Sequence, residues 1–306
     1  MLLFSFFFSF LTWFNAPAPS SEVSSALKPV SVYLSTNKGH TWEGFAKGLP
    51  EDLSVIDVLE HEDNIYISAI GKGLYVLEKD SDSWEERSAG LPGIKSYESV
   101  PLGKKTRMDY FPTSLAAQGS RLVLGSFDDG VHYSDDQGKS WQQASTNIDD
   151  VVGALLFTND MLIAGTHLGI WQSADGGINW KLRCETGFRI NVLAMHNDQL
   201  HVARQNGMGI LNGDNLEWSD LKTGWAIGQL ISHGDKLYAI TAKNEVYRTK
   251  TGELWEDNKF AIKGLPAASF IDAIWNGYTP QLPEEIPAGK IIPTSRGWIV
   301  ATGGGC

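Results

Sequence analysis

The chain has 306 residues, of which 42% are hydrophobic, and its formal net charge at pH 7 is -11. This acidic balance argues against a protein that binds nucleic acid or an anionic membrane surface, because both need a basic face. The 32 glycines and 11 tryptophans indicate many turns and a recurrent aromatic residue, which is a reason to expect an internal repeat.

The N-terminus differs from the rest. Residues 2–14 are nearly all apolar, and the first charged residue is Glu22. Such a run is too short to span a bilayer but suits the core of a signal peptide, and Ala16-Pro17-Ala18 offers a cleavage site. We therefore expect a signal peptide-like segment (1–18), a linker (19–30) and a secreted or periplasmic domain (31–306). A misassigned start or a retained anchor is the alternative, since no Lys or Arg precedes the apolar run.

An eight-residue pattern, here called the box, recurs in the remaining chain. It is complete in residues 134–141 and 173–180, and residues 35–42 repeat it with Asn in place of Asp. Residues 248–255 keep its Gly and Trp, while two further copies keep little more than Trp84 and Trp218. In the box, the Asp accepts hydrogen bonds from backbone N–H groups, the Gly permits positive φ and the Trp buries its ring. The structural box residues are Asn37, Gly39, Trp42, Ser134, Asp136, Gly138, Trp141, Ser173, Asp175, Gly177 and Trp180.

Short strands precede each box. Residues 192–195 and 200–204 flank a turn, and the same layout returns at 155–165 and 229–241, followed by a third strand such as 169–172. Four short strands in about 40 residues are typical of a propeller blade, with the box between the third and fourth strands. No helical periodicity is evident after the N-terminal segment.

The two ends of the chain are complementary. Residues 290–302 match the first two strands of a blade, and residues 31–42 match a third strand and its box. Joining them predicts an all-β, six-bladed propeller of four-stranded antiparallel blades, closed by N-terminal strands that pair with C-terminal strands; truncation of a longer parent is the alternative. Cys184 and Cys306 would then lie on opposite sides of the ring, too far apart for a disulfide.

The boxes resemble those of the Asp-box (BNR) repeat propellers, a group that includes sialidases, sortilin ectodomains, xyloglucanases and photosystem II assembly-factor propellers. The resemblance covers about residues 30–306. It implies the propeller fold, and it implies that ligands bind the face opposite the box turns. The shared residues are structural, so it does not identify a function.

Two long connections on that binding face are candidates for recognition, and both follow a Gly-Leu-Pro: residues 93–112 and 267–289. Long loops on a compact fold are usually functional or disordered. The predicted binding residues are Lys104, Lys105, Arg107, Tyr110, Trp275 and Tyr278 from these connections, and Phe127, Asp128, Asp129, His167, Arg204 and Asn206 from the inner rim. Capping of the ring, or an ordinary polar channel lining, is the alternative.

The sequence favours a non-catalytic scaffold that binds a protein or peptide, with a glycan as a possible ligand. The alternative is a sialidase-like glycosidase. For such an enzyme the resemblance implies three arginines that bind a carboxylate and a Tyr nucleophile. Residues 187–190 resemble part of a sialidase motif but lack its proline, and the arginines available are Arg107, Arg183, Arg189 and Arg204. No metal is expected, because His61, His196 and His233 fall in separate blades. No cofactor is expected either, because no Gly-rich phosphate loop lies between a strand and a helix.

Overall fold

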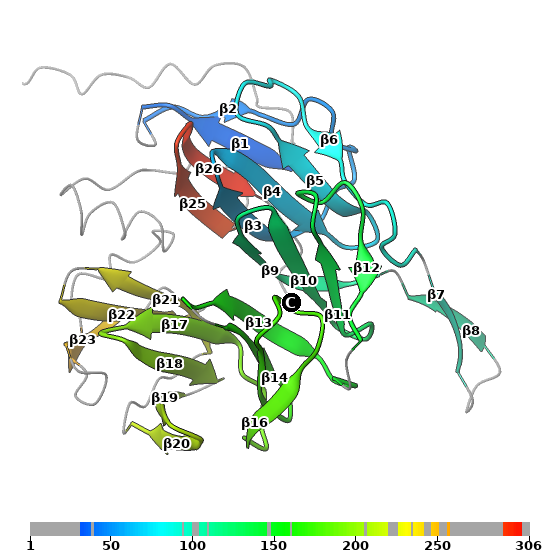
Figure 1. The fold of residues 1–306 in the computed structure, drawn as a ribbon. Helices are drawn as coiled ribbons and strands as arrows, with labels where there is room; N and C mark the ends of the chain where they lie inside the picture. The colour runs from blue at the N-terminus through cyan, green and yellow to red at the C-terminus, as the bar shows by residue number, and fades with distance from the viewer. Residues whose placement is uncertain are drawn as a thin grey trace, which may run out of the picture.

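A computed structural model describes residues 31–37, 40–93, 95–99, 104–108, 110–145, 148–159, 161–204, 207–219, 226–233, 235–241, 246–250, 256–257 and 290–301. The expected signal peptide-like segment and linker lie outside these residues. The described chain is all-β, and it has no helix long and apolar enough to cross a membrane. Its strands form six four-stranded antiparallel sheets, arranged as a six-bladed propeller, and one separate hairpin (Figure 1).

Five blades are continuous in sequence. The first two are β3 (Val55–His61), β4 (Asn64–Ala69), β5 (Gly73–Leu77) and β6 (Glu85–Glu86), then β9 (Pro112–Gln118), β10 (Arg121–Ser126), β11 (Val131–Ser134) and β12 (Gln142–Gln143). The third is β13 (Val152–Phe157), β14 (Leu162–Thr166), β15 (Gly169–Ser173) and β16 (Lys181–Glu185). The last two are β17 (Val192–His196), β18 (Gln199–Arg204), β19 (Gly207–Asn212) and β20 (Asn215–Trp218), then β21 (Ile227–His233), β22 (Lys236–Thr241), β23 (Val246–Thr249) and β24 (Glu256–Asp257).

The sixth blade is made from both ends of the described chain. Its strands are β1 (Val32–Ser35), β2 (Glu43–Gly44), β25 (Lys290–Thr294) and β26 (Gly297–Ala301), in the order β2-β1-β26-β25. Val32 pairs with Ala301 and Leu34 with Ile299 across the antiparallel β1–β26 ladder. The predicted closure is therefore confirmed. Of the two cysteines, Cys184 is a free thiol within β16, and Cys306 lies outside the described residues.

The first strands of the blades pack side by side, in the order β25, β3, β9, β13, β17 and β21. Side chains tie some of them together. The buried Asp57 carboxylate on β3 accepts a hydrogen bond from Leu115 N on β9 at 2.8 Å, and Ser114 Oγ on β9 accepts one from Leu155 N on β13 at 2.9 Å. Each bond satisfies a buried backbone donor and joins neighbouring blades.

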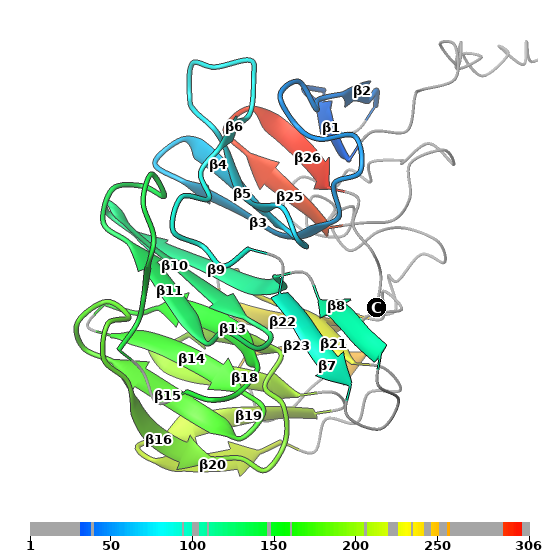
Figure 2. The same cartoon turned by 90° about the vertical axis from the view of Figure 1, so that its right-hand side faces the viewer.

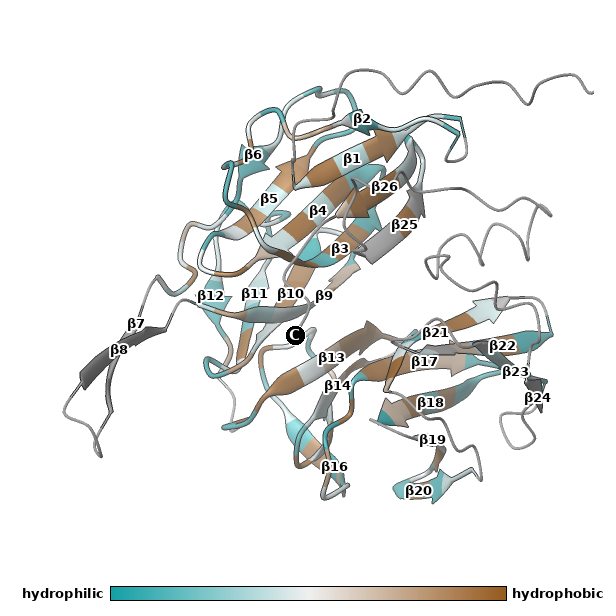
Figure 3. Ribbon diagram, turned by 180° about the vertical axis from the view of Figure 1, so that it is seen from behind, coloured by the Kyte–Doolittle hydropathy of each residue, from teal (hydrophilic) through white to brown (hydrophobic). Residues whose placement is uncertain are grey.

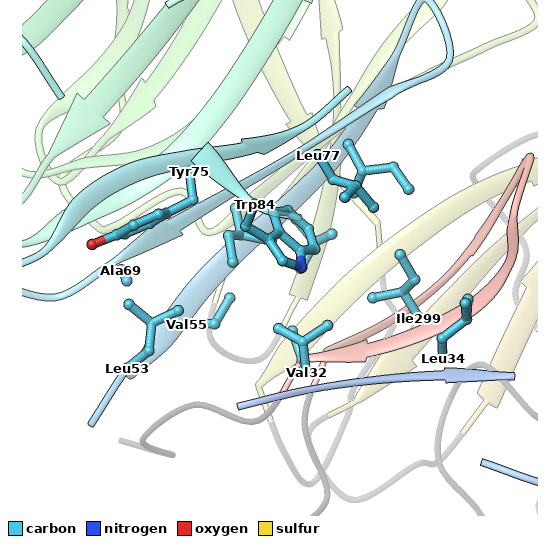
Figure 4. Packing of buried hydrophobic residues seen from close by; sticks show 13 residues of the cluster. Val32, Leu34, Leu53, Val55, Ala69, Tyr75, Leu77, Trp84 and Ile299 are labelled. Carbon is cyan, nitrogen blue, oxygen red and sulfur yellow. The ribbon is translucent and has the colours of Figure 1, made fainter. Parts of the chain in front are cut away.

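Hydrophobic clusters fill the spaces between blades. The cluster shown in Figure 4 joins the closing blade to the blade β3–β6, and it includes Val32, Ile299, Val55 and Trp84, all buried. Figure 3 shows the pattern that produces this packing, with brown strands such as β10 and β13 and teal fourth strands such as β12 and β20. Burial of these apolar faces is the main force that holds the blades together.

Trp84 and Trp141, one in each of two neighbouring blades, link their own blade to the preceding blade. The Trp141 backbone N–H donates to Ala89 O, and its indole N–H donates to Arg87 O, both at 2.8 Å. Trp84 makes the same pair of bonds to Lys47 O and Phe45 O. Trp84 and Trp141 therefore fix the spacing of two blades in addition to burying a ring, whereas Trp180 donates its indole N–H to Gly177 O in its own box turn at 2.9 Å.

The predicted box turns are present between the third and fourth strands. Asp136 accepts hydrogen bonds at Oδ1 from Ser140 N (2.8 Å) and Ser134 Oγ (2.7 Å), and at Oδ2 from Ser140 Oγ (2.6 Å). Asp175 is held in the same way by Asn179 and Ser173. Gly138 and Gly177 adopt positive φ, at 85° and 99°. In the first copy Asn37 accepts a bond from Thr41 N at 2.9 Å, while Gly39 lies outside the described residues.

Trp218 departs from the expected repeat. The other described box tryptophans precede a fourth strand, whereas Trp218 ends β20, opposite Gly209. A tight turn at Gly213 and Asp214 replaces the box here, and it joins β19 directly to β20. Trp218 is only partly buried, so the recurrence of a tryptophan at blade spacing does not guarantee the same role.

The first long connection contains regular structure. Its residues form a hairpin of β7 (Lys95–Ser99) and β8 (Lys104–Met108), which pair antiparallel from Lys95 and Met108 to Ser99 and Lys104. The hairpin extends away from the blades at the right of Figure 1, and it lies in front, towards the viewer, in Figure 2. The second connection, residues 267–289, lies outside the described residues.

Candidate functional site

Strand register separates two ends of the blades. In the blade β17–β20, Val192 lies opposite Ala203, Arg204 opposite Gly207, and Trp218 opposite Gly209. The blade-to-blade connections and the turns between second and third strands therefore share one end, here called the top face. The box turns lie at the other end.

A cavity of about 820 Å³ opens between the blades β9–β12 and β13–β16. The turn after β10 contributes Asp128 and Asp129, and the connection after β12 contributes Gln143, Ser145 and Asp149. Trp180, Ile148 and Ala144 supply its apolar part. Three carboxylate residues beside apolar side chains suit a cationic or amphipathic group better than an anion.

The turn after β10 is held rigidly. Ser126 N donates to Gly130 O and Asp129 N donates to Ser126 Oγ, both at 2.9 Å. Asp129 is buried, Asp128 is exposed, and Phe127 keeps 41% of its surface exposed while its ring contacts Phe111. Of the three predicted residues, Asp128 and Asp129 therefore line the cavity, whereas Phe127 presents an exposed aromatic ring.

The turn after β14 is the equivalent turn of the next blade, β13–β16. His167 is exposed, and Leu168 is 57% exposed, the largest value among the exposed large hydrophobic residues of the described chain. Leu168 N donates to Asp150 Oδ2 at 2.7 Å, which fixes the turn to the connection after β12. Leu168 and Phe127 therefore present apolar side chains from rigid turns of adjacent blades.

Tyr110 is not on the recognition surface where we expected it. Its side chain is 2% exposed and packs in the core beside His132, with ring centroids 5.9 Å apart. Burial, with a smaller contribution from the Asp128 charge, raises the pKa of the Tyr110 hydroxyl. The connection brings this tyrosine back into the core before β9 begins, which charge and aromatic content alone do not reveal.

The remaining predicted residues have different outcomes. Lys104, Lys105 and Arg107 lie on β8, in the projecting hairpin. Asn206, Trp275 and Tyr278 lie outside the described residues. Arg204 ends β18 on the top face, where its guanidinium packs over the rings of Phe188 and Trp218.

The arginines of the sialidase alternative do not all face one way. Arg183 bonds to Gly213 O at 2.6 Å and Asp214 Oδ1 at 3.3 Å, in the tight turn at the end opposite the top face. Arg189 and Arg204 belong to the top face. Among the described arginine side chains, a converging set of three is therefore not formed on this face. Within the described residues, groups of three or more possible metal ligands are also not found.

Sequence reasoning missed the connection after β12. The connection is shorter than the two selected as recognition candidates, yet Gln143, Ser145 and Asp149 form much of the cavity wall. The adjacent acidic residues Asp149 and Asp150 are a weak signal, because such pairs are common on solvated surfaces. Leu168 carried a clearer signal, as an apolar residue between His167 and Gly169 in an otherwise polar turn.

No protein-family model and no curated protein matches this sequence. Solved structures do match. The extracellular domain of BT4673 from B. thetaiotaomicron gives a TM-score of 0.60 at 14% identity, over 92% of this chain and 38% of that one. YCF48 bound to D1 peptide gives 0.52 at 14%, over 76% and 73%, and the WD40 propeller domain of Doa1 gives 0.50 at 11%, over 76% and 72%. At these identities the likeness shows the β-propeller fold alone, and this chain spans well under half of the BT4673 chain.

Proposed function

We propose that this chain is a non-catalytic, extracytoplasmic propeller of the Asp-box type that holds a protein or peptide partner on its top face. The observation that supports this best is the cavity between two blades together with the rigid turns that expose Phe127 and Leu168. Phe127 precedes the lining residue Asp128, and Leu168 N is bonded to Asp150, which follows the lining residue Asp149. An apolar anchor next to charged groups is the usual composition of a protein-binding surface. YCF48 with its D1 peptide and the WD40 domain of Doa1 are propellers of similar fold.

The cavity suggests how the partner is held. Asp128, Asp129 and Asp149 would attract a lysine or arginine side chain, and Phe127 and Leu168 would cover apolar residues on either side of it. The hairpin β7–β8 follows Gly90-Leu91-Pro92 and projects from the body, so it would enlarge the contact area. A glycan could occupy the same cavity, although a protein segment makes better use of the exposed apolar side chains.

The sialidase-like alternative has less support. It needs three arginines around one carboxylate, whereas Arg183 is committed to Asp214 at the opposite end of the blade. It also needs an accessible tyrosine nucleophile, a role for which Tyr110, the described tyrosine among the predicted binding residues, is unsuited because it is buried with a raised pKa. The Asp-box assignment is supported by the geometry of the Asp136 and Asp175 turns.

Partner capture tests the proposal. The hairpin is replaced by a short Gly-Ser linker between Gly93 and Tyr110, which keeps Tyr110 in the core. A second variant carries Phe127→Ser with Asp128→Asn on the top face. Each should lose capture of the same protein from the native extract, by about tenfold or more if the removed side chains are binding hot spots. A matched control is Lys139→Ala, which changes an exposed residue in a box turn at the other end.

Unchanged capture by both variants, with normal folding by circular dichroism, would contradict a top-face scaffold. Export is checked separately by N-terminal sequencing of the mature protein. We expect a start near residue 19.

A further inference from the structure

Most of the arginine side chains that the structure describes have polar or charged partners. Arg87 pairs with Glu78 and Glu85, Arg121 with Asp135, and Arg183 with Asp214. Arg296 donates to the backbone carbonyls of Glu78, Lys79 and Ser81, and Arg248 also has a partner. Among the arginine side chains that the structure describes, Arg189 and Arg204 make no hydrogen bond and no ion pair. Both belong to the top face.

Arg204 is held by two aromatic rings. Its Cζ lies 4.6 Å from the Phe188 ring centroid and 4.2 Å from that of Trp218. The two rings contact each other edge to face, with centroids 4.8 Å apart and planes at 72°. Cation–π contact with both rings fixes the guanidinium without using its N–H donors.

One of those donors has no partner. Arg204 Nε is buried and makes no hydrogen bond. It lies against Gly207, where an added Cβ would approach Nε to 3.0 Å. Leaving a charged donor unsatisfied is costly, so the unpartnered guanidinium of Arg204 needs an explanation, and a bound group at this site is one. The neighbouring Arg189 is exposed on the same connection as Phe188, and it adds positive potential to this part of a chain whose net charge is negative.

We infer that Arg204, supported by Phe188 and Trp218, binds a carboxylate of the partner. Because Nε is buried while the residue is partly exposed, the carboxylate would meet the two terminal Nη groups, whose N–H bonds match its two oxygens. The rings already hold the guanidinium, so little side-chain entropy remains to be lost on binding. This inference rests on the proposed function and adds the chemistry of one contact. The carboxylate belongs either to an acidic side chain or to a chain terminus.

Three acetylated tetrapeptides distinguish these sources. One is tetra-alanine with a free C-terminal carboxylate, one is an amidated alanine peptide with a single internal Glu, and the third is amidated tetra-alanine without a carboxylate. Each is titrated into ¹⁵N-arginine-labelled protein, and the Arg204 Nε–H cross-peak is followed by NMR after assignment with Arg204→Lys. We expect saturable shifts with one or both carboxylate peptides and none with the neutral peptide.

Variants then test the geometry. They are labelled uniformly with ¹⁵N, and binding is followed at the Gly207 backbone amide, which is present in the wild type and in every variant. Arg204→Lys should weaken binding about tenfold, because a point charge replaces the planar fork. Trp218→Leu should weaken it as well, since the guanidinium loses a ring that holds it. Arg183→Gln, at the opposite end, should leave binding unchanged.

Two results would overturn the inference. One is an equal response to all three peptides, and the other is a larger response to inorganic phosphate than to either carboxylate. Neither result argues against the scaffold proposal, because that proposal is tested by whether the hairpin and Phe127 variants lose capture of the partner. Conversely, capture that survives those variants but is lost with Arg204→Lys would support this contact and reject the proposed placement of the main surface.

Discussion

Gly90 has no side chain, and the carbonyl oxygen of Trp141 occupies the space where one would begin. A Cβ at this position would lie 2.3 Å from that oxygen, and the backbone has a φ of 92°. Gly48 has the same relation to Trp84. The Gly-Leu-Pro sequences at 48–50 and 90–92 are therefore the points at which one blade receives the box tryptophan of the next.

This relation predicts that Gly90→Ala lowers the free energy of unfolding by more than about 1–2 kcal/mol, which is the cost of the left-handed backbone alone for a residue with Cβ. The added methyl group would also displace Trp141 and weaken its bond to Ala89 O. Urea denaturation followed by tryptophan fluorescence measures the loss. Gly93→Ala is the matched control, because open space surrounds Gly93, and its effect should stay within about 0.5 kcal/mol. Equal losses in the two variants would refute this role for Gly90.

At the scale of an element, the box turn is an acid-sensitive structure. Partial burial works against ionisation of Asp136, but hydrogen bonds from Ser140 and Ser134 prevail and lower its pKa to about 2. Similar bonds lower the pKa of Asp175. A carboxyl whose folded pKa is depressed adds stability above its unfolded pKa, near 4, and this stability is lost as the pH falls towards the folded value.

Asp136→Asn should therefore lose about 1 kcal/mol at pH 7, where an amide replaces a charged acceptor. The same variant should lose less further stability than the wild type between pH 4 and pH 2, because it has one fewer group to protonate. The free energy of unfolding at pH 7, 4 and 2.5 tests both statements. The first box indicates that the fold survives, since Asn37 keeps the bond from Thr41 N and donates to Thr41 Oγ1 at 2.8 Å. A variant as acid-sensitive as the wild type would count against this origin.

Elements differ in how far the sequence predicts them. The box turns at Asp136 and Asp175 were predictable because their hydrogen bonds are local, within four residues. Trp218 and Tyr110 were not, because the length of a neighbouring turn and the path of a connection decide where each ring lies. The cavity at Asp149 also depends on how two blades meet, which spacing along the chain does not encode. Recognition residues at such junctions follow from tertiary structure.

At the scale of the whole molecule, the closing blade connects segments that are more than 250 residues apart in sequence (Leu34 and Ile299). Ile299 is fully buried on β26, in a cluster shared with Val32, Val55 and Trp84. Ser295 N also donates to Glu60 Oε1 on β3 at 2.7 Å, so the closing blade is joined to its neighbour by polar bonds as well as by apolar packing. The predicted closure required only the two half-patterns at the ends, which explains why the sequence was sufficient here.

A ring closed in this way should unfold as one unit, and Ile299→Ala tests this. Removing three buried carbons should lower the free energy of unfolding by about 2–5 kcal/mol. If the blades are cooperative, hydrogen exchange should speed up by a similar factor in the closing blade and in Leu200 and Val202 of β18, two blades away around the ring. Ile299→Val should give the same pattern at about 0.5–1.5 kcal/mol. Faster exchange confined to β1, β25 and β26 would instead mean that the closing blade opens independently, and the rigid top face would then need another explanation.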